Sequence, residues 1–269
     1  MTEALNMAQL AVNRRNDEEM SAFLGLIYPG INDNQKGTLF DDIEKIATLT
    51  PAGLGESPNI IIYCDDDSRW RHATAEEIPG QEGRTDAQKA WIDPENDIVF
   101  DQRVDPRSLT NLDRQIPGCR EVGTATRAQT YTNLRTPTPD HDRGSIVTIT
   151  LCSRALTGPK IKYLTIGEIA AENLASRKAS NLFKLPNIDT FKLLSATVVH
   201  ELSHQILTSA IRYDDVRGAN SYRWPNISNM DLLSGLENAD SLAYTCIAAM
   251  LMEMGYSVDK DGDIKKKKT

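Results

Sequence analysis

The stretch LLSATVVHELSHQIL, residues 193–207, decides the fold, because it joins a helix-forming apolar pattern to a pair of histidines. Its apolar residues lie nearly all the way round a helical projection, which predicts a buried helix within residues 189–212. His200 and His204 are four residues apart. On a helix their imidazoles therefore lie only about 40° apart around the axis, and they can share one zinc ion.

Glu201 completes an HExxH motif with a carboxylate beside the first histidine. A glutamate there can reach a water at the metal without taking a coordination position, as a general base for peptide hydrolysis must. The other interpretation is two core histidines bonded to ordinary neighbours. With four histidines in 269 residues, chance predicts fewer than about 0.01 such motifs, so the metal interpretation is favoured.

A catalytic zinc needs a third protein ligand and an open position. The longer metzincin pattern would place glycine and histidine where the chain has Leu207 and Ala210, which excludes that class. The two remaining histidines, His72 and His141, lie far upstream in predicted loops and are less favoured as ligands.

Acidic residues near the start of a later apolar helix are the better candidates for the third ligand. Glu237 and Asp240 follow His204 by 33 and 36 residues, which leaves room for one loop and a return. We favour Asp240. If Glu237 were the ligand, Asp240 would instead orient a histidine through a hydrogen bond.

The composition describes a chain that can form a hydrophobic core, with 269 residues, 40% of them hydrophobic and 25% charged. The net charge is −8, and four of the 30 basic residues are the run Lys265–Lys268 at the C-terminus. The rest of the chain is therefore still more acidic, which argues against a nucleic-acid partner. No apolar run is long enough to span a membrane, and the N-terminus lacks the apolar core of a signal peptide. We therefore expect either a cytosolic protein or one whose export signal is missing from this sequence.

The order of apolar patterns along the chain predicts an α+β fold, with helices and strands in the front part and helices behind. We predict a single domain over residues 1–264 with an upper lobe, 1–187, a second lobe, 188–264, and a solvated basic tail, 265–269. Residues 59–64 are expected to form a central strand, and Thr38 is expected to cap the third helix. The predicted helices are 4–12, 20–27, 39–49, 165–184, 189–212 and 234–255, and the predicted strands are 59–64, 97–100, 128–132 and 145–152.

The motif and its surroundings resemble the aspzincin metallopeptidases, the group of deuterolysin and peptidyl-Lys metalloendopeptidase. Three further segments resemble a divergent fungal branch of that group: Tyr222–Asn226 (YRWPN), Asn238–Ser241 (NADS) and Thr148–Leu156 (TITLCSRAL). The chain departs from the group's Gly-Thr-x-Asp-x-x-Tyr-Gly pattern, because Asp240 lacks the Gly-Thr lead and the tyrosine follows four residues later.

This resemblance implies a zincin-like fold, with a small twisted sheet over the HExxH helix and a helical C-terminal part. It implies one zinc per chain held by His200, His204 and Asp240, with Glu201 as general base. A tyrosine would stabilise the oxyanion of the transition state, and Tyr244 or Tyr222 could supply it; Tyr244 could equally be a packing residue.

The resemblance also implies a secreted protein. The four cysteines form no CxxC pair, and in an exported protein Cys119 would pair with Cys152 or Cys64, with Cys246 as a free thiol in the core. We expect a monomeric zinc endopeptidase that acts on protein or peptide substrates. The alternatives are a non-catalytic secreted zinc-binding or effector protein that keeps the zincin fold, and a cytosolic metal-free interaction domain.

Overall fold

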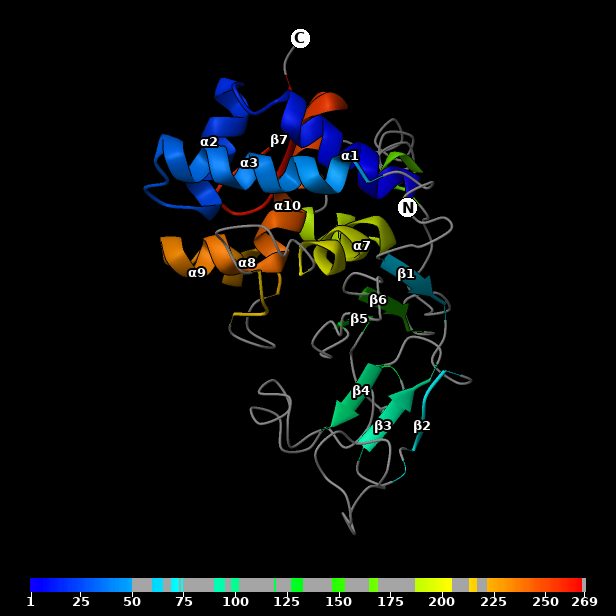
Figure 1. The fold of residues 1–269 in the computed structure, drawn as a ribbon. Helices are drawn as coiled ribbons and strands as arrows, with labels where there is room; N and C mark the ends of the chain where they lie inside the picture. Colours follow the sequence, from blue (N-terminus) through cyan, green and yellow to red (C-terminus); the bar gives the residue numbers. More distant parts are fainter. Residues whose placement is uncertain are drawn as a thin grey trace. The chain divides into compact units, whose positions relative to one another are not determined.

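The computed structural model describes two compact units of the chain (Figure 1). The first unit contains residues 1–49 and 162–269, and the second contains residues 50–161. The second unit is therefore a continuous insertion between two parts of the first. The described residues are 1–49, 60–64, 69–72, 74, 90–94, 98–101, 119, 127–132, 147–152, 165–168, 187–204, 213–216 and 222–267.

The first unit begins with three helices whose apolar faces are buried: α1 (Thr2–Asn13), α2 (Glu18–Ile27) and α3 (Asp33–Ala47). The third starts six residues earlier than predicted, because Asn32 and not Thr38 caps it. The Asn32 side chain accepts from the Gln35 amide and the Gln35 side chain accepts from the Asn32 amide, which forms a capping box.

The core of the first unit is α10 (Ala239–Glu253), which is buried on almost every side. It packs against α1, α2 and α7 (Leu194–Ser203), the helix that carries the HExxH motif. The short 3-10 helix η4 (Ile188–Phe191) precedes α7, and α8 (Trp224–Ile227) and α9 (Leu232–Glu237) precede α10. The hairpin of β7 (Tyr256–Val258) and β8 (Ile264–Lys266) ends the described chain.

The second unit contains two small sheets. In the first, β6 (Val147–Leu151) lies between β1 (Ile60–Tyr63), which is parallel to it, and β5 (Ala128–Thr132), which is antiparallel. In the second, β3 (Ala90–Asp93) pairs antiparallel with both β2 (Arg71–His72) and β4 (Ile98–Asp101). Residues 59–64 were predicted to form a central strand, but among the described strands the central one is β6.

A buried arginine joins the two sheets of the second unit. The Arg69 guanidinium donates to Asp93 of β3 at 2.6 Å, to Thr150 of β6 at 2.5 Å, and to Thr148 of β6. Because a buried guanidinium needs its charge and its donors matched, Arg69 and its three acceptors hold the two sheets together.

A disulfide also lies in the second unit. Cys119 is bonded to Cys152, the first of its two predicted partners.

The mixture of helices and small sheets confirms the predicted α+β class. The division into units differs from the predicted lobe boundary at residue 187, because α1 and α3 pack with the C-terminal helices. The basic tail is also placed differently: Lys265 and Lys266 belong to β8, and Lys267 is ion-paired with Glu19. Cys246 is a buried free thiol, as predicted.

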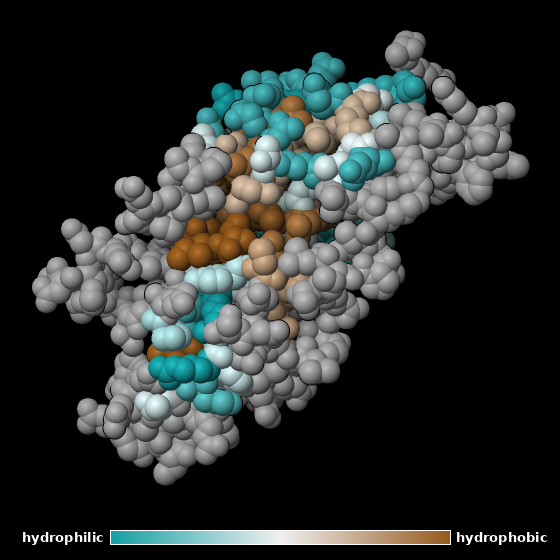
Figure 2. All heavy atoms as spheres, turned by 90° about the vertical axis from the view of Figure 1, so that its right-hand side faces the viewer, coloured by the Kyte–Doolittle hydropathy of each residue, from teal (hydrophilic) through white to brown (hydrophobic). Residues whose placement is uncertain are grey.

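On the face in Figure 2, hydrophilic residues gather at the upper end of the coloured part of the chain, and hydrophobic residues lie below them. Among the described residues, no helix is both long and apolar enough to cross a membrane.

Candidate metal centre

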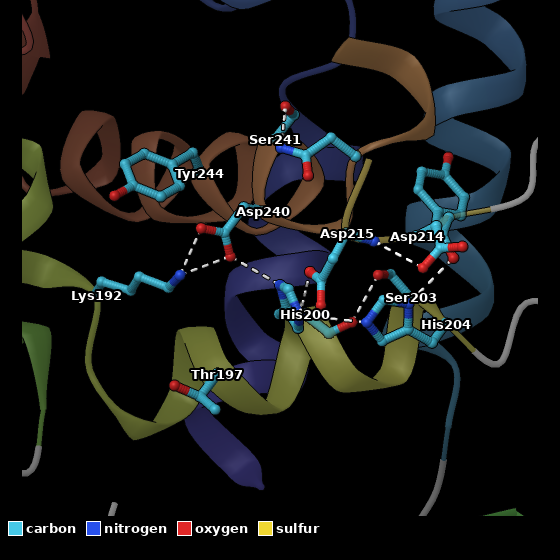
Figure 3. A network of polar contacts seen from close by, with 12 residues as sticks. Lys192, Thr197, His200, Ser203, His204, Asp214, Asp215, Asp240, Ser241 and Tyr244 are labelled. Atoms are coloured by element: carbon cyan, nitrogen blue, oxygen red, sulfur yellow. Dashed lines mark hydrogen bonds and ion pairs between the residues drawn. The ribbon is translucent and has the colours of Figure 1, made fainter. Parts of the chain in front are cut away.

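α7 presents two imidazoles that meet at its C-terminal end (Figure 3). The Nε2 atoms of His200 and His204 lie 3.2 Å apart, and the ring planes are nearly perpendicular, at 88°. His200 is 5% exposed, and the surrounding helix is buried. The predicted helix therefore brings the two histidines together as the four-residue spacing requires.

The other nitrogen of each ring is hydrogen-bonded, and these bonds decide which nitrogen carries the proton. Nδ1 of His204 lies 3.0 Å from the Tyr213 carbonyl oxygen, which can only accept, so this Nδ1 donates. Nδ1 of His200 lies 2.7 Å from Oδ1 of Asp240, a carboxylate, and donates as well. When Nδ1 of a neutral imidazole donates, the lone pair is on Nε2, and the two Nε2 atoms lie together here; metal-binding histidines are oriented in this way.

A third potential ligand, Asp215, comes from the segment after α7. Its Oδ1 lies 3.4 Å from Nε2 of His200, and ligand atoms of His200, His204 and Asp215 all lie within 4.8 Å of one another. This Oδ1 is buried and has no hydrogen-bond partner among the residues that the structure describes. A buried carboxylate oxygen without a partner is costly, and a cation between the three side chains would satisfy it.

The backbone around Asp215 is fixed by the junction of α9 and α10. The Asp214 amide donates to the Glu237 carbonyl at 2.7 Å, and the Ala239 amide donates to the Asp214 carbonyl at 3.1 Å. These bonds form a parallel bridge between Asp214 and Asn238. The carboxylate of Asp215 is therefore held beside the histidines by an element that is far away in the sequence.

Asp240, the predicted third ligand, is not in the group that could hold the ion. It lies at the first turn of α10, and its carboxylate sits between Nδ1 of His200 and Nζ of Lys192, at 2.5–2.7 Å from both (Figure 3). It thus contacts the side of the ring that faces away from His204. The packing of α10 on α7 was foreseen, but which ring nitrogen meets the carboxylate depends on the rotation of both helices.

Charge pairing shifts the pKa values of Asp240 and His200. Burial opposes ionisation of Asp240, yet the Lys192 ammonium and the hydrogen bond to His200 hold its pKa below its usual value. Burial also disfavours a charged His200, but the hydrogen bond and charge of Asp240 outweigh it, so the pKa of His200 is raised. Lys192 also lies 4.7 Å from the centre of the Tyr222 ring, in cation–π contact.

Glu201 is buried, at 5% exposure, and its negative charge acts on both His200 and Tyr222. Its carboxylate is therefore in the same electrostatic environment as the histidine pair, as expected for the glutamate of the motif.

The two candidate tyrosines are placed differently. The Tyr222 ring centre lies 6.1 Å from that of His200, and the negative charge of Asp215 acts on its hydroxyl. The Tyr244 hydroxyl points away from His200 (Figure 3) and donates to Asp189 at 2.5 Å. Burial raises the pKa of Tyr222, with a further contribution from Asp215, so its hydroxyl stays protonated.

The remaining candidates are not brought to the histidine pair. Glu237 is exposed at the end of α9. His72 is exposed in the second unit, and its ring lies 4.0 Å from that of Trp91. His141 lies outside the described residues. Asp215 was missed in the sequence, where the only signal is the acidic pair Asp214-Asp215, which follows His204 by ten and eleven residues.

Comparisons of the chain with protein family models, with curated proteins and with solved structures found no match. The residues and their geometry alone therefore carry the functional proposal.

Proposed function

We propose that this protein is a zinc-dependent endopeptidase in which His200, His204 and Asp215 hold the metal and Glu201 is the general base. The observation that carries the proposal is the convergence of two Nε2 lone pairs and one unpartnered carboxylate oxygen on the same point. A cation at this point would satisfy all three groups at once, whereas a proton on Nε2 of His200 is the only donor that the three side chains themselves could supply.

The donor set fits zinc. Two imidazole nitrogens and one carboxylate oxygen leave a fourth tetrahedral position open, which is the ligand count of catalytic zinc sites. When bound, zinc lowers the pKa of a water to about 7 and polarises a carbonyl group. The hydrogen bonds from His200 to Asp240 and from His204 to the Tyr213 carbonyl support the same assignment, because they use Nδ1 of each ring and leave Nε2 to face the proposed ion.

Glu201 and Tyr222 have separate roles in the proposed reaction. The Glu201 carboxylate takes a proton from the attacking water and returns it to the nitrogen of the leaving amine. The Tyr222 hydroxyl, kept protonated by its raised pKa, donates to the carbonyl oxygen as negative charge develops there. Asp240 keeps the His200 ring oriented throughout, and Lys192 balances its charge.

We also propose that the chain is related to the aspzincins. In this chain, Asp215 would be the third metal ligand, and Asp240 would orient the ligand His200. Secretion is also proposed, and the disulfide between Cys119 and Cys152 supports it, because such bonds persist in oxidising compartments.

The test is Glu201→Gln, which keeps the shape of the side chain and removes its basicity. Zinc content should stay near one per chain, and cleavage of an unfolded protein substrate should fall at least about 100-fold. Glu237→Gln is the matched control, because it neutralises an exposed glutamate away from the histidines, and it should leave both quantities unchanged.

Two outcomes would contradict the proposal in different ways. If the wild-type protein takes up no zinc, the proposed metal site does not exist. Wild-type protein that binds zinc but cleaves none of a panel of unfolded substrates would favour the non-catalytic zinc-binding alternative.

A further inference from the structure

The segment Tyr213–Asp215 supplies two parts of the candidate metal centre although it belongs to no helix or strand. The Tyr213 carbonyl accepts from Nδ1 of His204, and two residues later Asp215 supplies the carboxylate. Both groups depend on the position of this short piece of backbone. Something outside it must therefore hold it in place.

One anchor is the bridge between Asp214 and Asn238, and the other is the Tyr213 side chain. The Tyr213 ring is 4% exposed, and its hydroxyl donates to Oδ2 of Asp42 at 3.1 Å. Asp42 is itself buried on α3, where its Oδ1 accepts from Lys45 at 2.8 Å. A residue near the N-terminus of the first unit is thereby connected to the segment that holds Asp215.

The chemistry of this contact makes it persistent. The Tyr213 ring and the Asp42 carboxylate are both buried, so water hardly competes for this hydrogen bond. Hydrogen bonds to charged acceptors are stronger than those between neutral groups, and more so away from water. Loss of the hydroxyl would leave a buried carboxylate oxygen without this donor.

We propose that Tyr213 is a positioning residue, anchored by Asp42 of α3, that sets the places of His204 and Asp215. Its consequence for metal binding rests on the proposed function. Groups that orient metal ligands are worth about 10- to 100-fold in metal affinity when removed. Tyr213 acts on two of the three ligands through one short backbone segment, so its loss should lie in this range.

The first measurement compares Tyr213→Phe with Tyr28→Phe. Tyr28 is an equally buried phenol whose hydroxyl lies 3.3 Å from that of Thr245 on α10, so its removal matches the loss of one buried hydroxyl hydrogen bond. In a competition titration of zinc against a chromophoric chelator, Tyr213→Phe should weaken zinc binding at least about tenfold. Tyr28→Phe should change it less than about twofold.

The second measurement uses the acceptor. Asp42→Asn keeps an oxygen that can accept from the Tyr213 hydroxyl, whereas Asp42→Ala removes it. The asparagine variant should bind zinc within about threefold of wild type, and the alanine variant should resemble Tyr213→Phe. In a chain that already carries Tyr213→Phe, adding Asp42→Ala should have little further effect on zinc affinity, because the anchor is already lost.

A third measurement, in metal-free protein, separates this inference from the proposed function. The Asp214 amide is bonded to the Glu237 carbonyl, so its hydrogen-exchange rate reports how firmly the segment is held. It should rise at least about tenfold in Tyr213→Phe and stay unchanged in Tyr28→Phe. If wild type binds no zinc, the proposed function fails while this exchange rate still decides the anchoring. Unchanged exchange in Tyr213→Phe, or equal zinc affinities for the two tyrosine variants, would overturn the positioning role.

Discussion

Asp215→Ala should abolish tight zinc binding, whereas the same change at the exposed Glu237 should not. Asp215 contributes one of three candidate ligand atoms, and its Oδ1 lies 3.4 Å from Nε2 of His200. Zinc binding at structural sites, which have four protein ligands, is worth about 10–16 kcal/mol. Each ligand there accounts for roughly 3 kcal/mol, so the loss of Asp215 should raise the Kd for zinc more than about 100-fold. Asp240→Asn should cost less, about 10- to 100-fold, because the amide oxygen still accepts from Nδ1 of His200.

The assay is a competition titration of metal-free protein with zinc and a chromophoric chelator, with circular dichroism to show that each variant is folded. The expected order of zinc affinity is wild type and Glu237→Ala first, then Asp240→Asn, then Asp215→Ala. An Asp215→Ala variant that binds zinc like wild type, beside an Asp240→Asn variant that loses more than about 100-fold, would refute the assignment of Asp215 and restore Asp240 as the ligand.

Three further changes test the structure itself by thermal unfolding. Gly262→Ala should lower the Tm, because Gly262 has a φ of +76° and an added Cβ would lie 2.5 Å from the Trp224 ring; an unchanged Tm would contradict this contact. Arg223→Gly should be more stable than Arg223→Ala by about 1 kcal/mol, since Arg223 has φ 72° and ψ 150°, a region that favours glycine. Arg69→Met should destabilise the second unit by about 3–5 kcal/mol, because Asp93 would lose its buried charge partner, and a loss below about 1 kcal/mol would show that the pair is dispensable.

The main helices and strands could be predicted from the sequence because their apolar patterns are local. The three N-terminal helices, the HExxH helix and the strand at 145–152 all appear. The start of α3 was missed, because Asn32 and Gln35 form their capping box outside the apolar pattern that marked the helix. The grouping of the helices was also missed, because the packing of α1 on α10 joins residues more than 200 positions apart.

The histidine pair could be predicted because helix geometry alone places side chains four residues apart on one face. The third ligand could not, because no periodic pattern marks the segment that contains Asp215. The prediction required an acidic residue on a helix packed against the first, and Asp240 meets that requirement and does contact His200. It does so through Nδ1, and no sequence pattern distinguishes one ring nitrogen from the other.

The long separation between α2 and α10 has a consequence for the newly synthesised protein. About 210 residues lie between them, and a ribosome adds about 5–20 residues per second, so the first helices wait roughly 10–40 s for the helix that covers them. During that time apolar side chains such as Met7 and Leu24, both fully buried in the finished fold, have no α10 to cover them. We therefore expect these apolar segments to need shielding from water while the rest of the chain is translated.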